Sequence, residues 1–211
     1  MSPEVASGTV QLETPGRQRL APSSSNLPLV DERTENAEVR ALFALYRERF
    51  GRTELPGIVL CFASNAALLR AMLQIAEDFL FGQSLLSRRH KEMIASYISR
   101  QNVCSYCADS HSALLASQGG SAGMICGLQK DDLNPQLFTS AELALLRFAD
   151  RVNANSPHIT RADVESAIHA GWTEAQVAEA VHITGLFAAF NRIANGFGLP
   201  SPCPDGLPDQ R

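Results

Sequence analysis

Apolar residues recur at helical spacing along most of this chain, and no segment shows the alternation of apolar and polar residues that is typical of a half-buried strand. Capping signals precede several of these stripes. Ser87 can cap one helix, and Thr139 with Glu142 forms a capping box before another. A further box, Thr173 with Gln176, precedes a long segment that is apolar on most sides. We therefore predict an all-α fold whose last long helix is central and buried.

Glycines and caps give the approximate limits of the expected helices. The predicted segments are Val39 to a stop at Gly51, Leu68 to Leu80 with an end near Gly82, the stretch after Ser87, Asn102 to Gly119, the stretch after Thr139 to Val152, Thr160 to Gly171, and Glu174 to Asn195. The apolar run 58–62 is the one strand-like stretch, and it stays ambiguous between strand and helix because Pro56 and Ser64 flank it.

Composition indicates one globular domain with extended ends. The chain has 211 residues, of which 45% are hydrophobic and 19% are charged, enough for one substantial core and few for two. Residues 1–35 contain prolines and a serine run but few large apolar residues, so we expect an extended N-terminal arm. We expect residues 36–199 to form a helical domain whose helices fall into two halves. Residues 200–211 are expected to form a Pro-rich tail.

Charge and hydropathy exclude several partners. The net charge is −4 and the basic residues are scattered, so we expect no nucleic-acid partner. No apolar run approaches the roughly 20 residues that span a bilayer, and the N-terminus does not resemble a signal peptide. We therefore expect a soluble, cytoplasmic protein with no membrane partner. Five cysteines without regular spacing argue against a secreted disulfide framework, and a cytosolic CxxC favours redox chemistry or metal binding.

The candidate catalytic residues lie in one motif. Glu92 is followed twelve residues later by the pair Cys104 and Cys107, and His111 lies four residues beyond. Positions i, i+3 and i+7 share a helix face, which places both thiols and the imidazole together. An N-cap at Asn102 would put Cys104 at position N2, where the positive end of the helix dipole lowers a thiol pKa.

The other two side chains complete a proton relay. His111 can accept a thiol proton, and Glu92 can orient the imidazole and stabilise its charged form. Because a single straight helix would direct Glu92 about 120° away from Cys104, the chain must bend around Gln101 and Asn102.

Other interpretations of the motif stay open. The two cysteines and the histidine can simply line a packing face. A structural zinc site needs four ligands, whereas Cys61, Cys126 and Cys203 are scattered along the chain. We expect these three to be core or incidental surface residues. A thioredoxin is disfavoured because its CxxC lies in a βαβ unit.

The combination of Glu92, Cys104-Ser105-Tyr106-Cys107 and His111 resembles the signature of the AhpD-like branch of the carboxymuconolactone decarboxylase superfamily. The resemblance covers roughly residues 38–198. It implies an all-α domain that assembles into homo-oligomers. It also implies a peroxidase that needs no metal or other cofactor: a thiolate attacks a hydroperoxide, a sulfenic acid forms, and the second cysteine closes a disulfide that an external thiol or protein reductant reopens.

Carried over by position, Cys107 matches the attacking cysteine and Cys104 its resolving partner, while His111 transfers the proton and Glu92 is the relay carboxylate. The dipole argument instead favours Cys104 as the more acidic thiol, and the sequence leaves the order of attack open. Tyr106 departs from the family, in which a histidine precedes the second cysteine. This departure favours the alternative of a redox sensor or dithiol-disulfide exchange protein. A superfamily decarboxylase or a non-catalytic oligomeric binder is the third class, but the decarboxylase branch lacks this CxxC.

Overall fold

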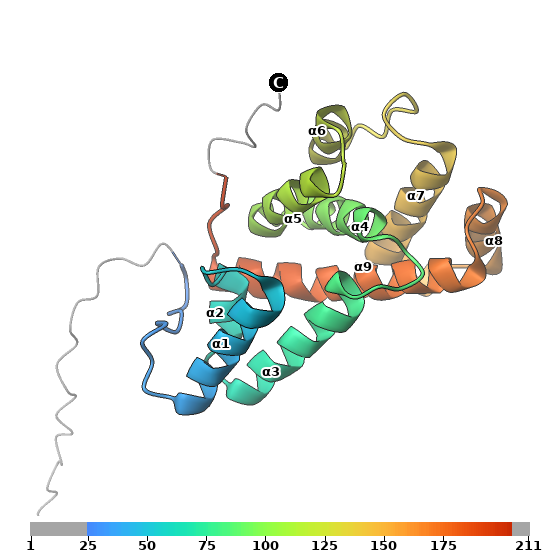
Figure 1. The fold of residues 1–211 in the computed structure, drawn as a ribbon. Coiled ribbons are helices and arrows are strands. Elements are labelled where there is room, and N and C mark those ends of the chain that lie inside the picture. Colours follow the sequence, from blue (N-terminus) through green and yellow to red (C-terminus); the bar gives the residue numbers. More distant parts are fainter. Residues whose placement is uncertain (1–24, 204–211) are drawn as a thin grey trace, which may run out of the picture.

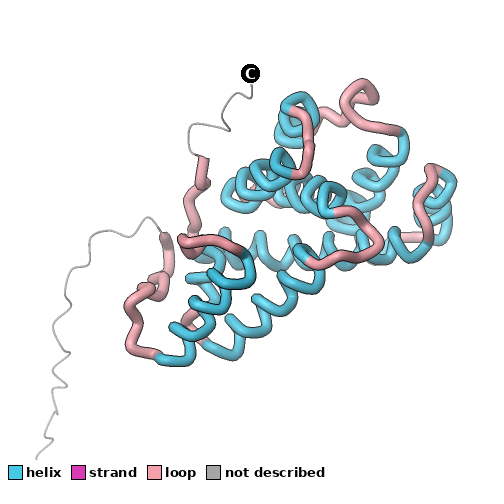
Figure 2. Tube along the Cα trace, in the orientation of Figure 1, coloured by secondary structure: helices cyan, strands magenta, loops and turns pink. Residues whose placement is uncertain are grey.

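The computed structural model describes residues 25–203, so most of the predicted arm and the end of the predicted tail lie outside it. Within this range every regular element is a helix, which confirms the all-α prediction (Figures 1 and 2). The elements are α1 (Ala37–Phe50), α2 (Gly57–Phe62), α3 (Ala66–Ile75), the π-helical η1 (Ala76–Phe81), α4 (Arg88–Gln101), α5 (Ser105–Ser117), α6 (Ala122–Lys130), α7 (Ser140–Asn155), the 3₁₀ turn η2 (Ser156–His158), α8 (Arg161–His169) and α9 (Glu174–Phe197).

Helix α9 lies between two groups of helices. Figure 1 shows α1, α2 and α3 on one side of its C-terminal half, and α4, α5, α6 and α7 on the other. The first group has its own apolar cluster, centred on residues such as Phe43 and Leu69. The second group forms the larger cluster with Ile183 and Phe187 of α9. The predicted long helix is thus central, although Val181 and His182 on its outer side are exposed.

Helix α4 is the most deeply buried element, since every residue from Lys91 to Ser99 is buried. Its polar side chains all find partners inside the fold. The Lys91 ammonium donates to the Gly82 carbonyl at 3.0 Å and lies 3.4 Å from the Glu179 carboxylate. The hydroxyls of Ser96 and Ser112 join α4 to α5 at 2.7 Å. Buried polar groups are tolerated when they are paired in this way.

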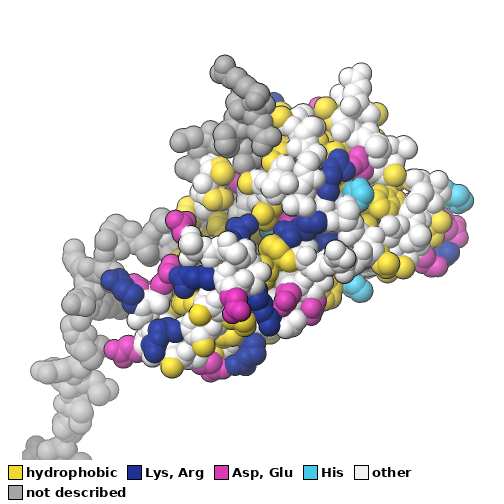
Figure 3. All heavy atoms as spheres, in the orientation of Figure 1, with side chains coloured by type: hydrophobic (Ala, Val, Ile, Leu, Met, Phe, Trp, Pro, Cys, Tyr) yellow, Lys and Arg dark blue, Asp and Glu magenta, His cyan; other side chains and the backbone are white. Residues whose placement is uncertain are grey.

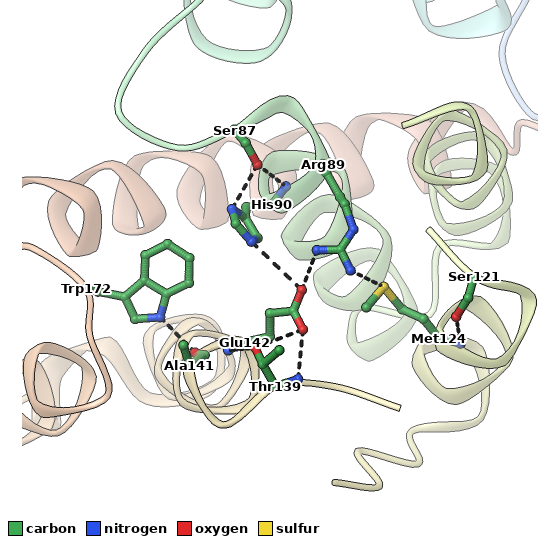
Figure 4. A network of polar contacts seen from close by, with 9 residues as sticks. All are labelled: Ser87, Arg89, His90, Ser121, Met124, Thr139, Ala141, Glu142 and Trp172. Atoms are coloured by element: carbon green, nitrogen blue, oxygen red, sulfur yellow. Dashed lines mark hydrogen bonds and ion pairs between the residues drawn. The ribbon is translucent and has the colours of Figure 1, made fainter. Parts of the chain in front are cut away.

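A polar network ties the start of α4 to the start of α7 (Figure 4). Glu142 completes the predicted capping box with Thr139 and also accepts a hydrogen bond from Arg89. The Trp172 indole donates to the Ala141 carbonyl at 2.7 Å, and its ring lies edge-on to His90. Trp172 is therefore a packing anchor, as expected for a buried indole with a satisfied N–H.

Three local predictions were wrong or incomplete. The ambiguous run 58–62 is helical and belongs to α2. Asn102 does not cap the helix that carries the cysteines; it ends α4 instead. Helix α6 was not anticipated, although Ser121 caps it by accepting from the Met124 N–H.

No helix within residues 25–203 has the length and hydropathy to cross a bilayer. The face seen in Figure 3 carries Lys and Arg side chains interspersed with Asp and Glu. This face shows none of the continuous basic surface that nucleic-acid binding uses.

Candidate active site

A sharp turn between α4 and α5 builds the site. The last turn of α4 ends at Gln101, and Val103 adopts a left-handed backbone with a φ of 54° before α5 starts at Ser105. The Asn102 side chain fixes this turn by bonding Asn153 of α7 at 3.0 Å and Asn191 of α9 at 2.9 Å. The bend expected around Gln101 and Asn102 is therefore present.

The position of Cys104 differs from the prediction. It is the N-cap of α5 rather than its second residue, because Val103 and not Asn102 reverses the chain direction. Cys107 consequently lies at the third helical position. Both thiols still lie at the N-terminal end of α5, where the unsatisfied N–H groups favour negative charge.

Glu92 reaches His111 across the two helices. Its carboxylate is fully buried and lies 2.6 Å from Nδ1 of His111, while Arg88, one turn earlier on α4, contacts the other carboxylate oxygen. Burial by itself raises the pKa of Glu92, but the His111 imidazole and the Arg88 guanidinium outweigh it, and the pKa lies below its ordinary value. Because an ionised carboxylate only accepts hydrogen bonds, Nδ1 carries the proton and Nε2 is left as the basic nitrogen.

The two thiols interact directly and share their titration. A hydrogen bond from the Cys107 thiol lowers the pKa of Cys104 to about 7; burial opposes this, and the Cys107 N–H and the Asn191 side-chain amide add to the lowering. The same hydrogen bond, together with burial, raises the pKa of Cys107. The first proton therefore leaves from Cys104, and the pair must be treated as one coupled system.

The surroundings of the thiols are apolar. Cys104 and Cys107 are 1% and 3% exposed and pack against Cys61 of α2, Ala194 of α9 and Leu199. Burial raises the pKa of Cys61 to about 11, so this third sulfur stays protonated at neutral pH. Its place in the cluster is core-like, as expected from the sequence.

A cavity of about 740 Å³ opens in front of Cys107 and His111, which lie one helical turn apart on α5. Its other walls come from α1, the loop before α2, α2, α3, η1, α9 and the segment that follows α9, and most of its lining is apolar. Phe187 closes one side, with its ring 4.5 Å from the His111 ring in an edge-on arrangement. Cys104 and Glu92 do not line the cavity, so Cys107 and His111 form the half of the site that faces the cavity, and Cys104 and Glu92 support it from behind.

Tyr106 has a positioning role. Its hydroxyl accepts a hydrogen bond from the Ile58 N–H at 3.1 Å, which fixes α2 against α5. Burial raises the pKa of Tyr106 to about 12, so its phenol does not act as a base near neutral pH.

All four predicted site residues come together, and two supporting residues were missed. Arg88 holds Glu92 from the same helix, and its spacing of four residues was a usable signal. Asn191 acts on Cys104 from the last helix, and no local pattern announces such a distant contact. Within residues 25–203, no three His, Cys, Asp or Glu side chains gather as a metal site would require.

Solved structures of other proteins have a similar fold. A peroxidase-related protein from Silicibacter sp. TM1040 has 26% sequence identity and a TM-score of 0.72, with 88% of this chain and 95% of that chain covered. A peroxidase-related protein with an alkylhydroperoxidase AhpD core from Ralstonia eutropha JMP134 has 23% identity and a TM-score of 0.76, with coverages of 86% and 94%.

A more distant neighbour is the debrominase Bmp8, seen as a variant in complex with 2,3,4-tribromopyrrole. It has 18% identity and a TM-score of 0.56, over 85% of this chain and 89% of that chain. At this identity the likeness concerns the fold alone. No curated protein matches the chain.

The family model that matches is the carboxymuconolactone decarboxylase family, over residues 66–151. This segment runs from α3 into α7 and contains Glu92, Cys104, Cys107 and His111. Residues 66–151 thus match the carboxymuconolactone decarboxylase family, and the fold of the chain is that of the peroxidase-related proteins with an AhpD core.

Proposed function

We propose that the protein is a thiol-dependent peroxidase that reduces hydroperoxides with Cys107 and Cys104. The observation that carries the proposal is the shared cavity of Cys107 and His111, with His111 held from behind by a buried, ionised Glu92. A thiol, a base and a carboxylate that orients the base are the parts of an activated nucleophile. The peroxidase-related solved relatives support the same reading.

Although Cys104 is the more acidic thiol, the form that reacts is the one in which Cys104 keeps its proton and Cys107 has lost its own. In the first step His111 accepts the Cys107 proton at Nε2, and Glu92 stabilises the imidazolium. The Cys107 thiolate attacks the terminal oxygen of the hydroperoxide, so that an S–O bond forms while the O–O bond breaks. The leaving alkoxide, or hydroxide from hydrogen peroxide, takes the proton back from His111. Cys107 becomes a sulfenic acid and the substrate becomes an alcohol or water.

In the second step Cys104 resolves the sulfenic acid. Its thiolate is favoured by the Cys107 N–H and the Asn191 side-chain amide, and it lies next to the Cys107 sulfur. The S–S bond forms, hydroxide leaves the sulfenic sulfur, and a proton from solvent converts it to water. This division of labour uses Cys107 as the attacking thiol because it faces the cavity, and Cys104 as the resolving thiol because it lies behind.

The cavity favours organic hydroperoxides with an apolar body. It is of the size of ordinary ligand pockets, and Phe50, Leu80 and Phe190 are among its apolar walls. Hydrogen peroxide is small and polar, so contact with these apolar side chains would add little to its binding.

Dithiol-disulfide exchange without rapid peroxide turnover is the second candidate. Tyr106 favours it, because a phenol with a pKa of about 12 stands where the best-known relatives carry a histidine, and the site keeps one imidazole.

Peroxide consumption separates the two functions. The purified chain with cumene hydroperoxide and dithiothreitol should consume peroxide catalytically, and Cys107→Ser should abolish this. Cys126→Ser is the matched control, since Cys126 is exposed on α6 and outside the cavity. Stoichiometric oxidation without turnover would support the exchange protein instead.

A further inference from the structure

A reductant must reach the buried thiol pair, and this inference rests on the proposed function. Once oxidised, Cys104 and Cys107 would hold their disulfide at positions that are 1% and 3% exposed. Thiol-disulfide exchange needs the attacking thiolate in line with the sulfur that it attacks. A small thiol fits a cavity of about 740 Å³, whereas a folded protein dithiol is far larger than this cavity and Cys107 is 3% exposed.

Cys203 occupies the position that such a carrier needs. It is partly exposed, and it lines the same cavity as Cys107 and His111. It lies 96 positions after Cys107 in the sequence, so only the fold brings the two thiols to one cavity.

The segment that carries Cys203 is fastened to the site. After α9 ends at Gly198, Leu199 packs into the cluster that contains Cys104 and Cys107. The Ser201 hydroxyl donates to the Asp109 carboxylate of α5, and the Cys203 N–H donates to the Ser201 hydroxyl oxygen at 2.9 Å. Figure 1 shows the chain leaving α9 on the side where α5 begins. These contacts hold Cys203 against the helix that carries the CxxC.

We propose that Cys203 is a third redox residue, which receives the disulfide from the buried pair and presents it to a protein dithiol. The Cys203 thiolate attacks the Cys107 sulfur, the Cys104–Cys107 bond breaks, and its electron pair leaves on Cys104. A Cys107–Cys203 disulfide results. A thiolate of the dithiol then attacks the Cys203 sulfur and releases Cys107, which is reprotonated.

The second thiol of the dithiol completes the cycle. It loses its proton and attacks the sulfur of the dithiol's other cysteine, which is bonded to Cys203 in the mixed disulfide. Cys203 then leaves as a thiolate, and the dithiol becomes a disulfide. Two electrons have moved from the dithiol to the protein. Cys104 is a suitable leaving group for the first exchange, because the Cys107 N–H and the Asn191 side-chain amide stabilise its departing thiolate.

The relay is tested in its reductive half. Wild type, Cys203→Ser and the control Cys126→Ser are oxidised with diamide and then reduced by thioredoxin or by dithiothreitol. Thioredoxin should reduce Cys203→Ser about tenfold or more slowly than wild type, while dithiothreitol, which enters the cavity, should show less than about a twofold difference. The proposal is overturned if thioredoxin reduces oxidised Cys203→Ser at the wild-type rate. It is also overturned if the substitution slows reduction by thioredoxin and by dithiothreitol equally.

A trapping experiment tests the bond itself. In Cys104→Ser, peroxide converts Cys107 to a sulfenic acid that Cys203 can condense with, and peptide mapping should find the Cys107–Cys203 link. A Cys107 that is only over-oxidised, or linked to Cys61, contradicts the relay. Failure of wild type to react with peroxide would instead remove the proposed function, and the diamide experiment would still decide the relay.

Discussion

Glu92 is the residue on which the chemistry of the site depends most. It is fully buried, and its carboxylate holds the imidazole of His111 through Nδ1 while Arg88 balances its charge. The basic nitrogen of His111 is thereby fixed as Nε2, on a side chain that lines the same cavity as Cys107.

Replacing His111 by Ala or Glu92 by Gln should slow the reaction of Cys107 with peroxide by about 10² to 10⁴ at neutral pH, the usual range for general-base catalysis. For His111→Ala, raising the pH should restore much of the rate, because hydroxide can remove the thiol proton instead. Stopped-flow measurement of the first turnover checks this. Cys107→Ser should stay inactive at every pH, and a wild-type rate for His111→Ala would return His111 to a packing role.

The pKa of Cys104 gives a prediction with a definite sign. Because the pKa is lowered to about 7, the thiolate absorbance at 240 nm should rise as the pH increases through 7. Cys104→Ser should remove this step. Cys107→Ala removes the hydrogen-bond donor and should move the step upward, toward the roughly 8.5 of a free thiol. A step that persists in Cys104→Ser would assign the acidic thiol to another cysteine.

At the scale of elements, the turn from α4 to α5 decides where the thiols lie. Val103 adopts a φ of 54° and is 77% exposed, although a β-branched residue is disfavoured in the left-handed region. The turn is held instead by Asn102 and its partners on α7 and α9.

Val103→Asn should therefore stabilise the fold by about 1 kcal/mol, since asparagine tolerates this backbone better. Urea unfolding monitored by circular dichroism measures the difference. Val103→Ala is the control: it removes the exposed apolar side chain but stays an ordinary L-residue, and it should gain less. If Val103→Asn were destabilising, the backbone at this turn would not be strained.

Sequence patterns predicted the helices with strong caps and long stripes, such as those after Ser87, Thr139 and Thr173. They failed at the short α2 and α6, whose few turns give no clear period. They also misplaced the start of α5. Asn102 is a good capping residue by type, but its side chain bonds to two distant helices, and tertiary contacts of this kind leave no local pattern.

At the scale of the whole molecule, an apolar stripe lies along α3 and η1. Leu68, Ile75 and Phe79 follow one another at helical spacing and are 53%, 39% and 38% exposed. Next to them, Phe79 contacts His182 of α9, and Val181 is also exposed. Contiguous exposed apolar side chains often mark contacts between proteins.

We therefore predict a particle larger than the single chain of 22.8 kDa, formed by copies of this chain. Light scattering at micromolar concentration measures the mass. Leu68→Glu should shift the mass toward that of one chain, whereas Leu27→Glu, which is equally exposed but lies outside the stripe, should not. A wild-type mass of one chain would remove this prediction.

The four site residues were predictable because their spacing is local on α4 and α5. The cavity was not, since its walls come from five separate parts of the chain, and neither was the approach of Cys203, which depends on where α9 ends. Both the cavity and the position of Cys203 depend on tertiary packing, which local sequence patterns do not reveal.

The most direct test of the account maps the cysteines after one equivalent of hydroperoxide, without a reductant. Alkylation and mass spectrometry should show that two thiols per chain are lost and that Cys104 and Cys107 are linked, as cysteines three residues apart at a helix start allow. If Cys104 and Cys107 both remain free thiols that alkylate fully while peroxide is consumed, the central claim is wrong.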